Sequence, residues 1–389
     1  MTDTTGPVRI RSLDIARGLV MVLMAVDHVR VYAAVPAGGP DPAVFFTRWI
    51  THFCAPGFVF FAGASAYLHR ATLPGLGALS RFLLIRGLWL VVLELTLMRL
   101  AWTFNFDVIN YNLAGVLWMI GWSMVALAGL IWLPFNAIAA VGLAMIFGHN
   151  LIDPYVRDLG RSVAEDPLRW LYQFLYFGGS VRVGESGPRI AILYSLLPWI
   201  GVMAAGYAFG KVLALPEARR RRACLAIGAG SIALFLLLRT FNIYGDPRHW
   251  SPQQPLSFLN TAKYPASLLF LLMTLGPLIL LMPFFDRMRG TIARALETFG
   301  RVPLFYYVLH IPLIHLAAVA ISLIRTGAVT PWLFGNHPME PPEPPDGYRW
   351  SLPLLYLVTA ICVGLLYVAC RWYAEWRRRY SSNVVARLI

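Results

Sequence analysis

The stretch that decides the fold is Ser12-Leu13-Asp14-Ile15-Ala16-Arg17-Gly18, followed by an apolar run that ends in Met24-Ala25-Val26-Asp27-His28. A helix that begins near Leu13 places Asp14 and Arg17 one turn apart, at one face of a membrane. His28 then lies roughly 21 Å further along, at about 1.5 Å per residue. Because the hydrocarbon layer is about 30 Å thick, Asp27 and His28 are predicted inside it, in the half far from Asp14. Ionisable groups at that depth are costly and mark functional sites.

The composition is that of a membrane protein. The 389 residues are 58% hydrophobic and only 13% charged, with a mean hydropathy of +0.62. A soluble chain of this length exposes far more charge. The fold class predicted is an all-α polytopic membrane protein with about ten transmembrane helices. They are expected at 13–34, 45–68, 82–104, 113–132, 134–149, 190–211, 223–241, 264–284, 301–324 and 352–371.

The basic residues predict the orientation, since cytoplasmic loops carry an excess of Lys and Arg. One side collects Arg9, Arg11, Arg17, Arg70, Arg81, Arg86, Lys211, Arg219 to Arg222, Arg287, Arg289, Arg294, Arg301, Arg371, Arg377 to Arg379 and Arg387. Both termini are therefore expected in the cytoplasm. Residues 1–389 are predicted to form a single membrane-embedded domain, with external loops at about 150–189, 242–263 and 326–350.

The net charge of +14 does not indicate nucleic-acid binding. Arginines that set membrane topology and meet anionic lipid explain it, and no zinc-finger spacing or basic recognition helix is present in the sequence. The four cysteines all fall in predicted spans without paired spacing, so buried thiols are expected rather than disulfides. No metal site is predicted.

Polar residues from five predicted spans fall at the same depth, in the outer half of the membrane. They are Asp27 and His28 in the first span, Arg48 and His52 in the second, Arg239 and Asn242 at the end of the seventh, Lys263 before the eighth, and Tyr306, His310 and His315 in the ninth. A structural explanation stands beside the functional one for each. A buried histidine can bond a neighbouring helix, and interfacial cations can extend to the headgroups.

Such a cluster could perform acyl transfer. A neutral imidazole can remove a proton from a hydroxyl or amine acceptor. Asp27 and His28 are adjacent on a helix and do not face each other, so a carboxylate or histidine from another span is expected to orient His28. Arg239 and Lys263 could stabilise an oxyanion or hold an anionic acceptor. His28, His52 and His310 are the catalytic candidates.

Several stretches in order resemble the heparan-alpha-glucosaminide N-acetyltransferase catalytic-domain family, in its bacterial-type branch. They are residues 11–18 with Met24 and Asp27-His28, residues 51–63, residues 260–265 with 271–277, and residues 300–310. The wider group of transmembrane acyltransferases opens with a similar Leu-Asp, Arg-Gly and His first span. The resemblance covers nearly the whole chain.

The resemblance implies a multi-span acyltransferase in which His28 is the base. Asp14 and Arg17 would then shape the cytoplasmic end of a donor channel. Apart from the resemblance, their shared depth makes Asp27, Arg48, Asn242 and Tyr306 candidates for substrate binding together with Arg239 and Lys263. The sequence departs from the family's lysosomal member at one point, because the active histidine of that member precedes the second span, at a position that falls near Pro42 here. Either His28 or His52 therefore takes the base role, or this branch does something else.

The function expected is transfer of an acyl group, acetyl on the resemblance, from cytoplasmic acyl-CoA to an amine or hydroxyl of a sugar-containing acceptor at the outer face. Acetyl-CoA or another acyl-CoA is the co-substrate, with no metal. The partners expected are membrane lipid and a glycan or glycolipid acceptor, and a homodimer is the assembly considered. The location expected is the cell membrane, the inner membrane if the chain is bacterial. The alternative is a proton-coupled transporter or lipid flippase, since intramembrane His and Asp residues also relay protons.

Overall fold

The computed structural model describes residues 9–162, 166–339 and 342–380, and its contacts group into two compact units. Unit 1 comprises Met1–Ser12, Ala55–Leu95 and Val108–Asp286, and unit 2 comprises Leu13–Cys54, Thr96–Asp107 and Arg287–Ile389. Residues 163–165 and 340–341 of the predicted loops, and Arg387 of the basic tail, lie outside the described residues. The single domain stays a prediction.

The prediction of an all-α polytopic membrane protein is confirmed. Among the described residues, seven helices are long and apolar enough to cross a membrane. They are Pro42–Arg70, Leu76–Thr103, Phe135–Tyr155, Glu217–Thr240, Leu268–Arg287, Pro303–Thr326 and Leu352–Arg379. Each coincides with one predicted span, because a long apolar run can satisfy its backbone in lipid only as a helix.

The other three predicted spans also contain helices. Val116–Leu130 and Leu197–Leu213 are apolar but shorter. Arg11–Tyr32 is 22 residues long and carries the ionisable residues of the opening motif. The number of spans and the side on which the termini lie stay predictions.

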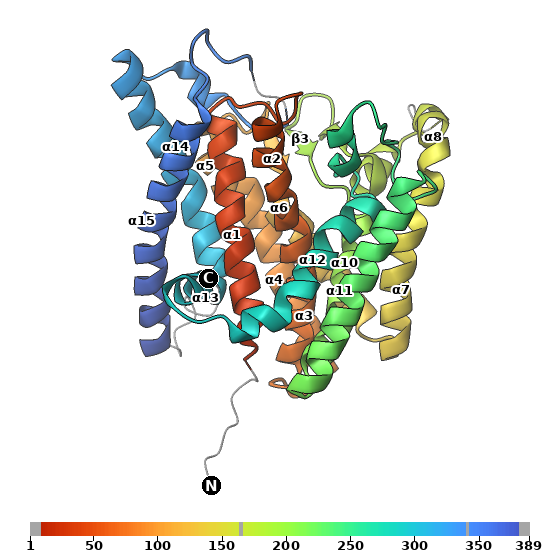
Figure 1. Ribbon diagram of the computed structural model, residues 1–389. Helices are drawn as coiled ribbons and strands as arrows, with labels where there is room; N and C mark the ends of the chain where they lie inside the picture. Colours follow the sequence, from red (N-terminus) through yellow and green to blue (C-terminus); the bar gives the residue numbers. More distant parts are fainter. Residues whose placement is uncertain (1–8, 163–165, 340–341, 381–389) are drawn as a thin grey trace. The chain divides into compact units, whose positions relative to one another are not determined.

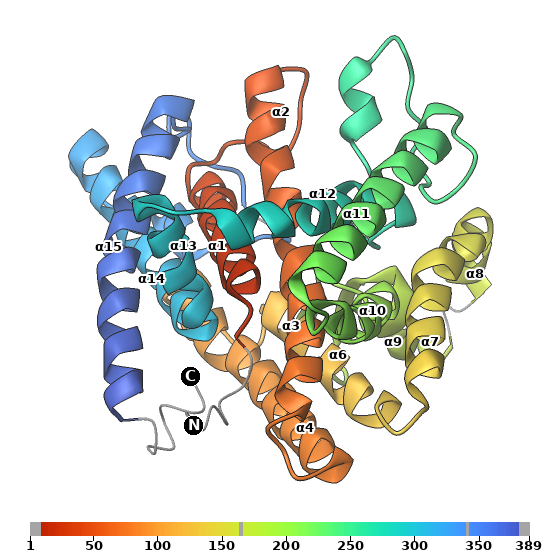
Figure 2. The ribbon, with the colours of Figure 1, turned by 60° about the horizontal axis from the view of Figure 1, so that its bottom comes forward.

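Unit 1 is a group of helices around α10 (Leu197–Leu213), which packs against both α6 (Val116–Leu130) and α7 (Phe135–Gly148) (Figures 1 and 2). Helix α6 also packs along α4 (Leu76–Leu93). The unit is completed by α3 (Cys54–Arg70), α8 (Val156–Ser162), α9 (Arg169–Tyr172), α11 (Glu217–Thr240) and α12 (Leu268–Arg287).

A small sheet in unit 1 corrects two of the predicted span limits. Strand β3 (Arg189–Ile192) pairs in parallel with β1 (Asn112–Ala114) and antiparallel with β2 (Gly179–Arg182). The spans predicted from 113 and from 190 therefore begin with strands, and their helices start only at Val116 and Leu197. A short apolar run does not distinguish a strand from the first turn of a helix, which explains the error.

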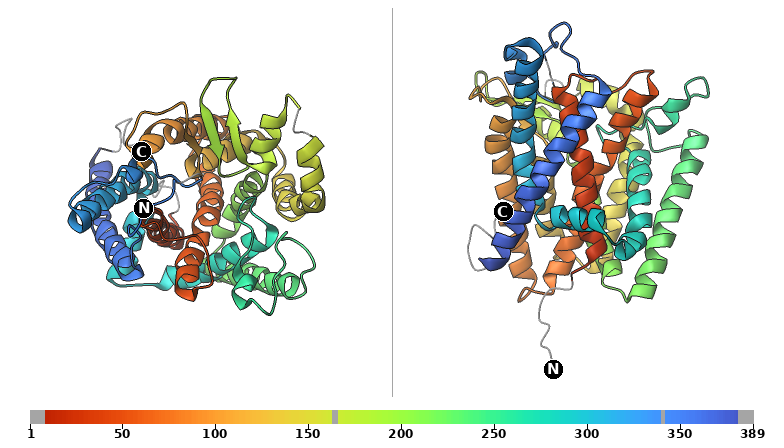
Figure 3. Two further views of the ribbon diagram at one scale, coloured as in Figure 1. Left: turned by 90° about the horizontal axis from the view of Figure 1, so that it is seen from above. Right: turned by 60° about the vertical axis from the view of Figure 1, so that its left-hand side comes forward.

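Unit 2 contains α1 (Arg11–Tyr32), α2 (Pro42–Trp49), α5 (Arg99–Thr103), α13 (Thr291–Arg301), α14 (Pro303–Thr326) and α15 (Leu352–Arg379). Helices α14 and α15 pack along each other, and α13 lies crosswise to them (Figures 1 and 3).

Helices α1 and α13 approach so closely that only glycine fits at two positions. A Cβ atom added to Gly18 would lie 1.9 Å from the carbonyl oxygen of Leu296, and one added to Gly300 would lie 1.8 Å from that of Asp14. Each helix thus contributes a glycine against the backbone of the other. This explains why the opening motif places glycine directly after Arg17.

The far end of α1 is capped by the predicted loop at 326–350. Asn336 donates a hydrogen bond to the carbonyl of Val31, and the Tyr348 hydroxyl donates to that of Tyr32 at 2.9 Å. Burial raises the pKa of Tyr348, so its phenol stays protonated and remains a donor. The last carbonyls of a helix lack partners within the helix, and this loop satisfies them.

Candidate functional site

A pair of histidines lies at the centre of unit 2. The Nδ1 atom of His28, on α1, lies 2.7 Å from the Nε2 atom of His310, on α14. The two rings stack with their centroids 4.9 Å apart. His310 is fully buried, and its own Nδ1 lies 2.5 Å from the carbonyl oxygen of Tyr307.

These contacts determine where the protons of a neutral pair lie. A carbonyl oxygen only accepts hydrogen bonds, so Nδ1 of His310 carries a proton and donates it to Tyr307. Nε2 of neutral His310 is then the acceptor, and His28 donates from its Nδ1. The lone pair of His28 is consequently on Nε2, the nitrogen that can take a proton from a substrate.

Aromatic rings hold this pair in place. Tyr306 stacks on His310 with centroids 5.6 Å apart, and its hydroxyl donates to the carbonyl of Met21 on α1 at 3.0 Å. The Trp102 ring meets His28 edge to face at 5.0 Å. Tyr306, predicted to bind substrate, thus orients His310 through its ring. Trp102 was not among the predicted site residues, because an aromatic residue in an apolar span is usually part of the core.

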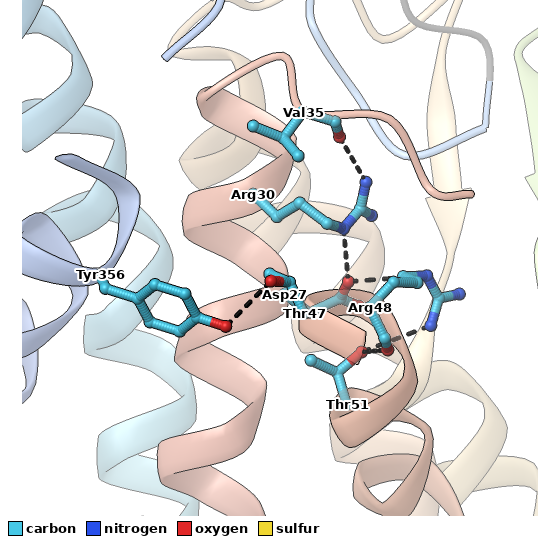
Figure 4. Close-up of polar contacts among 7 residues, drawn as sticks. All are labelled: Asp27, Arg30, Val35, Thr47, Arg48, Thr51 and Tyr356. Carbon is cyan, nitrogen blue, oxygen red and sulfur yellow. Dashed lines mark hydrogen bonds and ion pairs between the residues drawn. The ribbon is translucent and has the colours of Figure 1, made fainter. Parts of the chain in front are cut away.

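Asp27 points toward two arginines, as Figure 4 shows. Its carboxylate lies 3.1 Å from Nε of Arg30 and 3.8 Å from Nε of Arg48 on α2. Arg30 also donates to the carbonyl of Val35 at 2.9 Å. These three side chains together carry a formal charge of +1. Arg30 was absent from the predicted site, although its i,i+3 spacing from Asp27 was readable in the sequence.

The remaining predicted histidines of unit 2 are also buried. His52 is 8% exposed in the short 3-10 helix Ile50–Phe53. Cys54 directly follows this 3-10 helix, and its thiol donates to the carbonyl of Val20 on α1 at 3.1 Å. His315 stacks on Phe104 with centroids 3.9 Å apart. The structure therefore joins His310 to His28 and gives His315 an aromatic environment of its own.

Asp14 and Arg17 lie at the beginning of α1, as predicted, in the turn that crosses α13. Asp14 is 7% exposed, and its carbonyl faces Gly300. These positions give both residues a packing context, and a role in a donor channel stays a prediction.

The predicted residues of unit 1 bond mainly to backbone. Arg239 is 1% exposed and donates to the carbonyls of Phe258 at 2.9 Å, Arg248 at 2.5 Å and Ser257 at 2.5 Å. Asn242 exchanges hydrogen bonds with the backbone of Trp250 in both directions. These two side chains hold the loop after α11 in shape. The geometry favours that structural role over an oxyanion role.

Unlike Arg239 and Asn242, which bond backbone groups, Lys263 lies near aromatic rings. It is 6% exposed, and its ammonium lies 5.3 Å from the ring centroid of Tyr264 and 5.8 Å from that of Tyr194. Within the described residues, the ammonium has neither a hydrogen bond nor an ion pair.

Glu94 is a buried carboxylate that the predicted site did not include. It begins the π-helical turn Glu94–Met98 and is 1% exposed. One carboxylate oxygen accepts a hydrogen bond from the backbone N–H of Leu117, in the first turn of α6, at 3.1 Å. A carboxylate stabilises a helix N-terminus, so Glu94 caps α6 from the neighbouring helix α4.

The residues described contain no group of three or more His, Cys, Asp or Glu side chains that could hold a metal ion. The four cysteines are free and buried, as the sequence predicted.

Fold and site together define a multi-pass membrane protein with a hydrogen-bonded histidine pair. The chain belongs to the family described as heparan-alpha-glucosaminide N-acetyltransferase, catalytic, whose model matches residues 9–240. This confirms the resemblance seen in the sequence and places the chain in a family of transmembrane acetyltransferases. No curated protein matches the chain. His28, His52 and Arg48 lie within the matched residues, whereas His310 lies beyond them.

Proposed function

We propose that this protein transfers an acetyl group from acetyl-CoA, bound from the cytoplasmic side, to an amine or hydroxyl of a sugar-containing acceptor at the outer face. The family supports acetyl transfer and acetyl-CoA as the co-substrate. The observation that carries the proposal is the hydrogen-bonded series from Tyr307 through His310 to His28, because it places the lone pair of neutral His28 on Nε2.

In the proposed reaction, Nε2 of His28 removes the proton from the acceptor nitrogen or oxygen. The deprotonated nitrogen or oxygen of the acceptor then bonds to the acetyl carbon, and the carbon–sulfur bond of the thioester breaks. The thiolate of CoA then takes the proton back from His28, so the enzyme returns to its starting state. His310 acts as a positioning residue by holding Nδ1–H of His28 throughout.

The other predicted residues have supporting roles in this proposal. Asp27 holds Arg30 and Arg48 beside the histidine pair, where their positive charge would favour an acceptor or a developing oxyanion. Asp14 and Arg17 would lie at the cytoplasmic end of the path taken by the donor. His52 is the alternative base.

The test is turnover of labelled acetyl-CoA by protein in lipid nanodiscs, supplied with a mixed glycan and glycolipid extract. Free CoA and labelled acceptor are both measured. General-base catalysis contributes about 10²- to 10⁴-fold, so His28→Ala should lower turnover by that factor while CoA binding persists. His249→Ala, at an exposed histidine of unit 1, is the matched control and should keep wild-type turnover.

Two outcomes would count against the proposal. Equal turnover in His28→Ala and wild type would transfer the base role to His52. Folded wild-type protein that neither binds acetyl-CoA nor releases CoA would sink acetyl transfer itself.

A further inference from the structure

The chain uses lysine at only two positions, although it has 33 basic residues. Lys211 is exposed, at the end of α10, with its ammonium 4.7 Å from the ring centroid of Phe135. Lys263 is the buried one. Arginine and lysine are not interchangeable, because lysine presents a compact point charge rather than a planar fork. The question is what the ammonium of Lys263 binds.

The backbone around Lys263 is held firmly. Lys263 pairs with Ala266 in a β-bridge, and the Ser267 N–H donates to the carbonyl of Ala262 at 2.9 Å. The Asp246 carboxylate braces this turn by accepting from the Ala262 N–H at 2.8 Å and the Ser267 hydroxyl at 2.6 Å. The position of the lysine is therefore fixed by the fold.

Asp246 is nevertheless not a counter-ion for Lys263. Its other oxygen accepts from the backbone N–H of Arg248 at 2.7 Å, so both carboxylate oxygens are occupied by other donors. Among the residues that the structure describes, no acid lies within ion-pair distance of the Lys263 ammonium. The two tyrosine rings are its neighbours, and the rings themselves meet at 5.3 Å with an interplanar angle of 68°.

Two aromatic faces compensate only part of the cost of burying an ammonium. A cation–π contact offsets less than the desolvation of an unpaired buried charge costs. Ser195, which directly follows Tyr194 in the chain, is also unsatisfied. It is 4% exposed, and its hydroxyl has no hydrogen-bond partner within the described part of the chain.

We propose that Lys263, with the rings of Tyr194 and Tyr264, binds a singly charged oxyanion, supplied by a lipid phosphodiester or by a soluble acidic molecule. One ammonium is neutralised by one negative charge. A doubly charged anion would carry an uncompensated charge into the low-dielectric surroundings, which is unfavourable. Tyr264 is 43% exposed, so the site borders on the protein surface and can be reached by a ligand.

This inference does not depend on acetyl transfer, because its test uses neither acetyl-CoA nor an acceptor. The protein is prepared with [13Cε]lysine and placed in nanodiscs of a neutral galactolipid, which carries no phosphodiester. Two lysine resonances are expected, and Lys211→Arg assigns them. Methyl sulfate and sulfate are then titrated at equal ionic strength, since they differ in charge but share their oxyanion chemistry.

We expect the Lys263 resonance alone to shift and to saturate, with methyl sulfate effective at about tenfold lower concentration than sulfate, a factor that corresponds to about 1.4 kcal/mol. Lys263→Met should abolish the site while leaving the Lys211 resonance unchanged. If that variant does not fold, the preference for the singly charged anion in wild-type protein still tests the proposal.

A second set of nanodiscs that contain phosphatidylglycerol identifies the source. A shifted Lys263 resonance that no longer responds to methyl sulfate would assign the site to a lipid headgroup. A response retained in both lipids would assign it to a soluble ligand. The proposal is overturned if both lysine resonances move together with ionic strength, or if neither anions nor lipid shift Lys263.

Discussion

Two groups of polar residues, one in each unit, are satisfied in different ways. In unit 2, His28 bonds the side chain of His310 and Asp27 bonds that of Arg30. In unit 1, Arg239 bonds three backbone carbonyls and Glu94 accepts from the backbone N–H of Leu117. Backbone groups do not titrate, so the second kind of contact builds a scaffold. Side-chain pairs can exchange protons, so the first kind can support chemistry.

The largest effect on turnover is expected when the histidine pair is disrupted. His28→Ala and His310→Ala should each lower turnover by about 10²-fold or more, and the double variant should be no worse than His28→Ala, because residues that act together are not additive. Steady-state CoA release measures this. Tyr306→Phe keeps the ring that stacks on His310 and should cost about tenfold or less. Losses that multiply in the double variant would contradict a coupled pair.

The next largest effect is expected on stability, at Arg239, which holds the loop after α11 in shape. Arg239→Gln leaves buried carbonyls without donors and should lower the free energy of unfolding by about 3–5 kcal/mol, with turnover per folded molecule unchanged. Thermal melting and folded yield in detergent report it. Arg248→Gln is the matched control, because Arg248 offers Arg239 only its backbone carbonyl. A stable Arg239→Gln with lost turnover would move Arg239 into the chemistry.

A smaller effect is expected at the crossing of α1 and α13. Gly18→Ala forces a methyl group against the carbonyl of Leu296, and such overpacking costs about 1–3 kcal/mol of stability. Gly230→Ala, in α11, meets no atom within 4 Å and should be neutral or slightly stabilising. The difference in melting temperature between the two variants is the measurement. Equal melting temperatures would show that the helices can separate without cost.

The smallest effect is expected at Glu94. Glu94→Gln retains an oxygen that can accept from Leu117, so the helix cap is kept and the cost should be about 1 kcal/mol or less. Glu94→Leu removes the acceptor and should cost about 1–3 kcal/mol. Chemical denaturation of the two variants separates these cases. Loss of turnover in a fully stable Glu94→Gln would instead give this carboxylate a role in proton transfer.

The sequence predicted the helices, because apolar runs must be helical in lipid. It also placed His28 and His310 among polar residues expected at one depth, since ionisable residues within such runs need partners there, but it did not pair these two histidines. The bonds of Arg239 and the cap formed by Glu94 could not be predicted. Their partners are backbone groups, which nearly every residue carries, so the sequence does not distinguish one partner from another. The short strands β1 and β3 were missed for a similar reason, since their pairing depends on segments far apart in the chain.

The two histidines are 282 positions apart in the chain, and this separation has a consequence for biosynthesis. Helix α1 is translated long before α14, so His28 is made while its partner does not yet exist. The contact that assigns the lone pair of His28 to Nε2 can form only once α14 has been made. Under the proposed function, a chain truncated before α14 would lack this arrangement, and acetyl transfer would begin only after α14 has been translated.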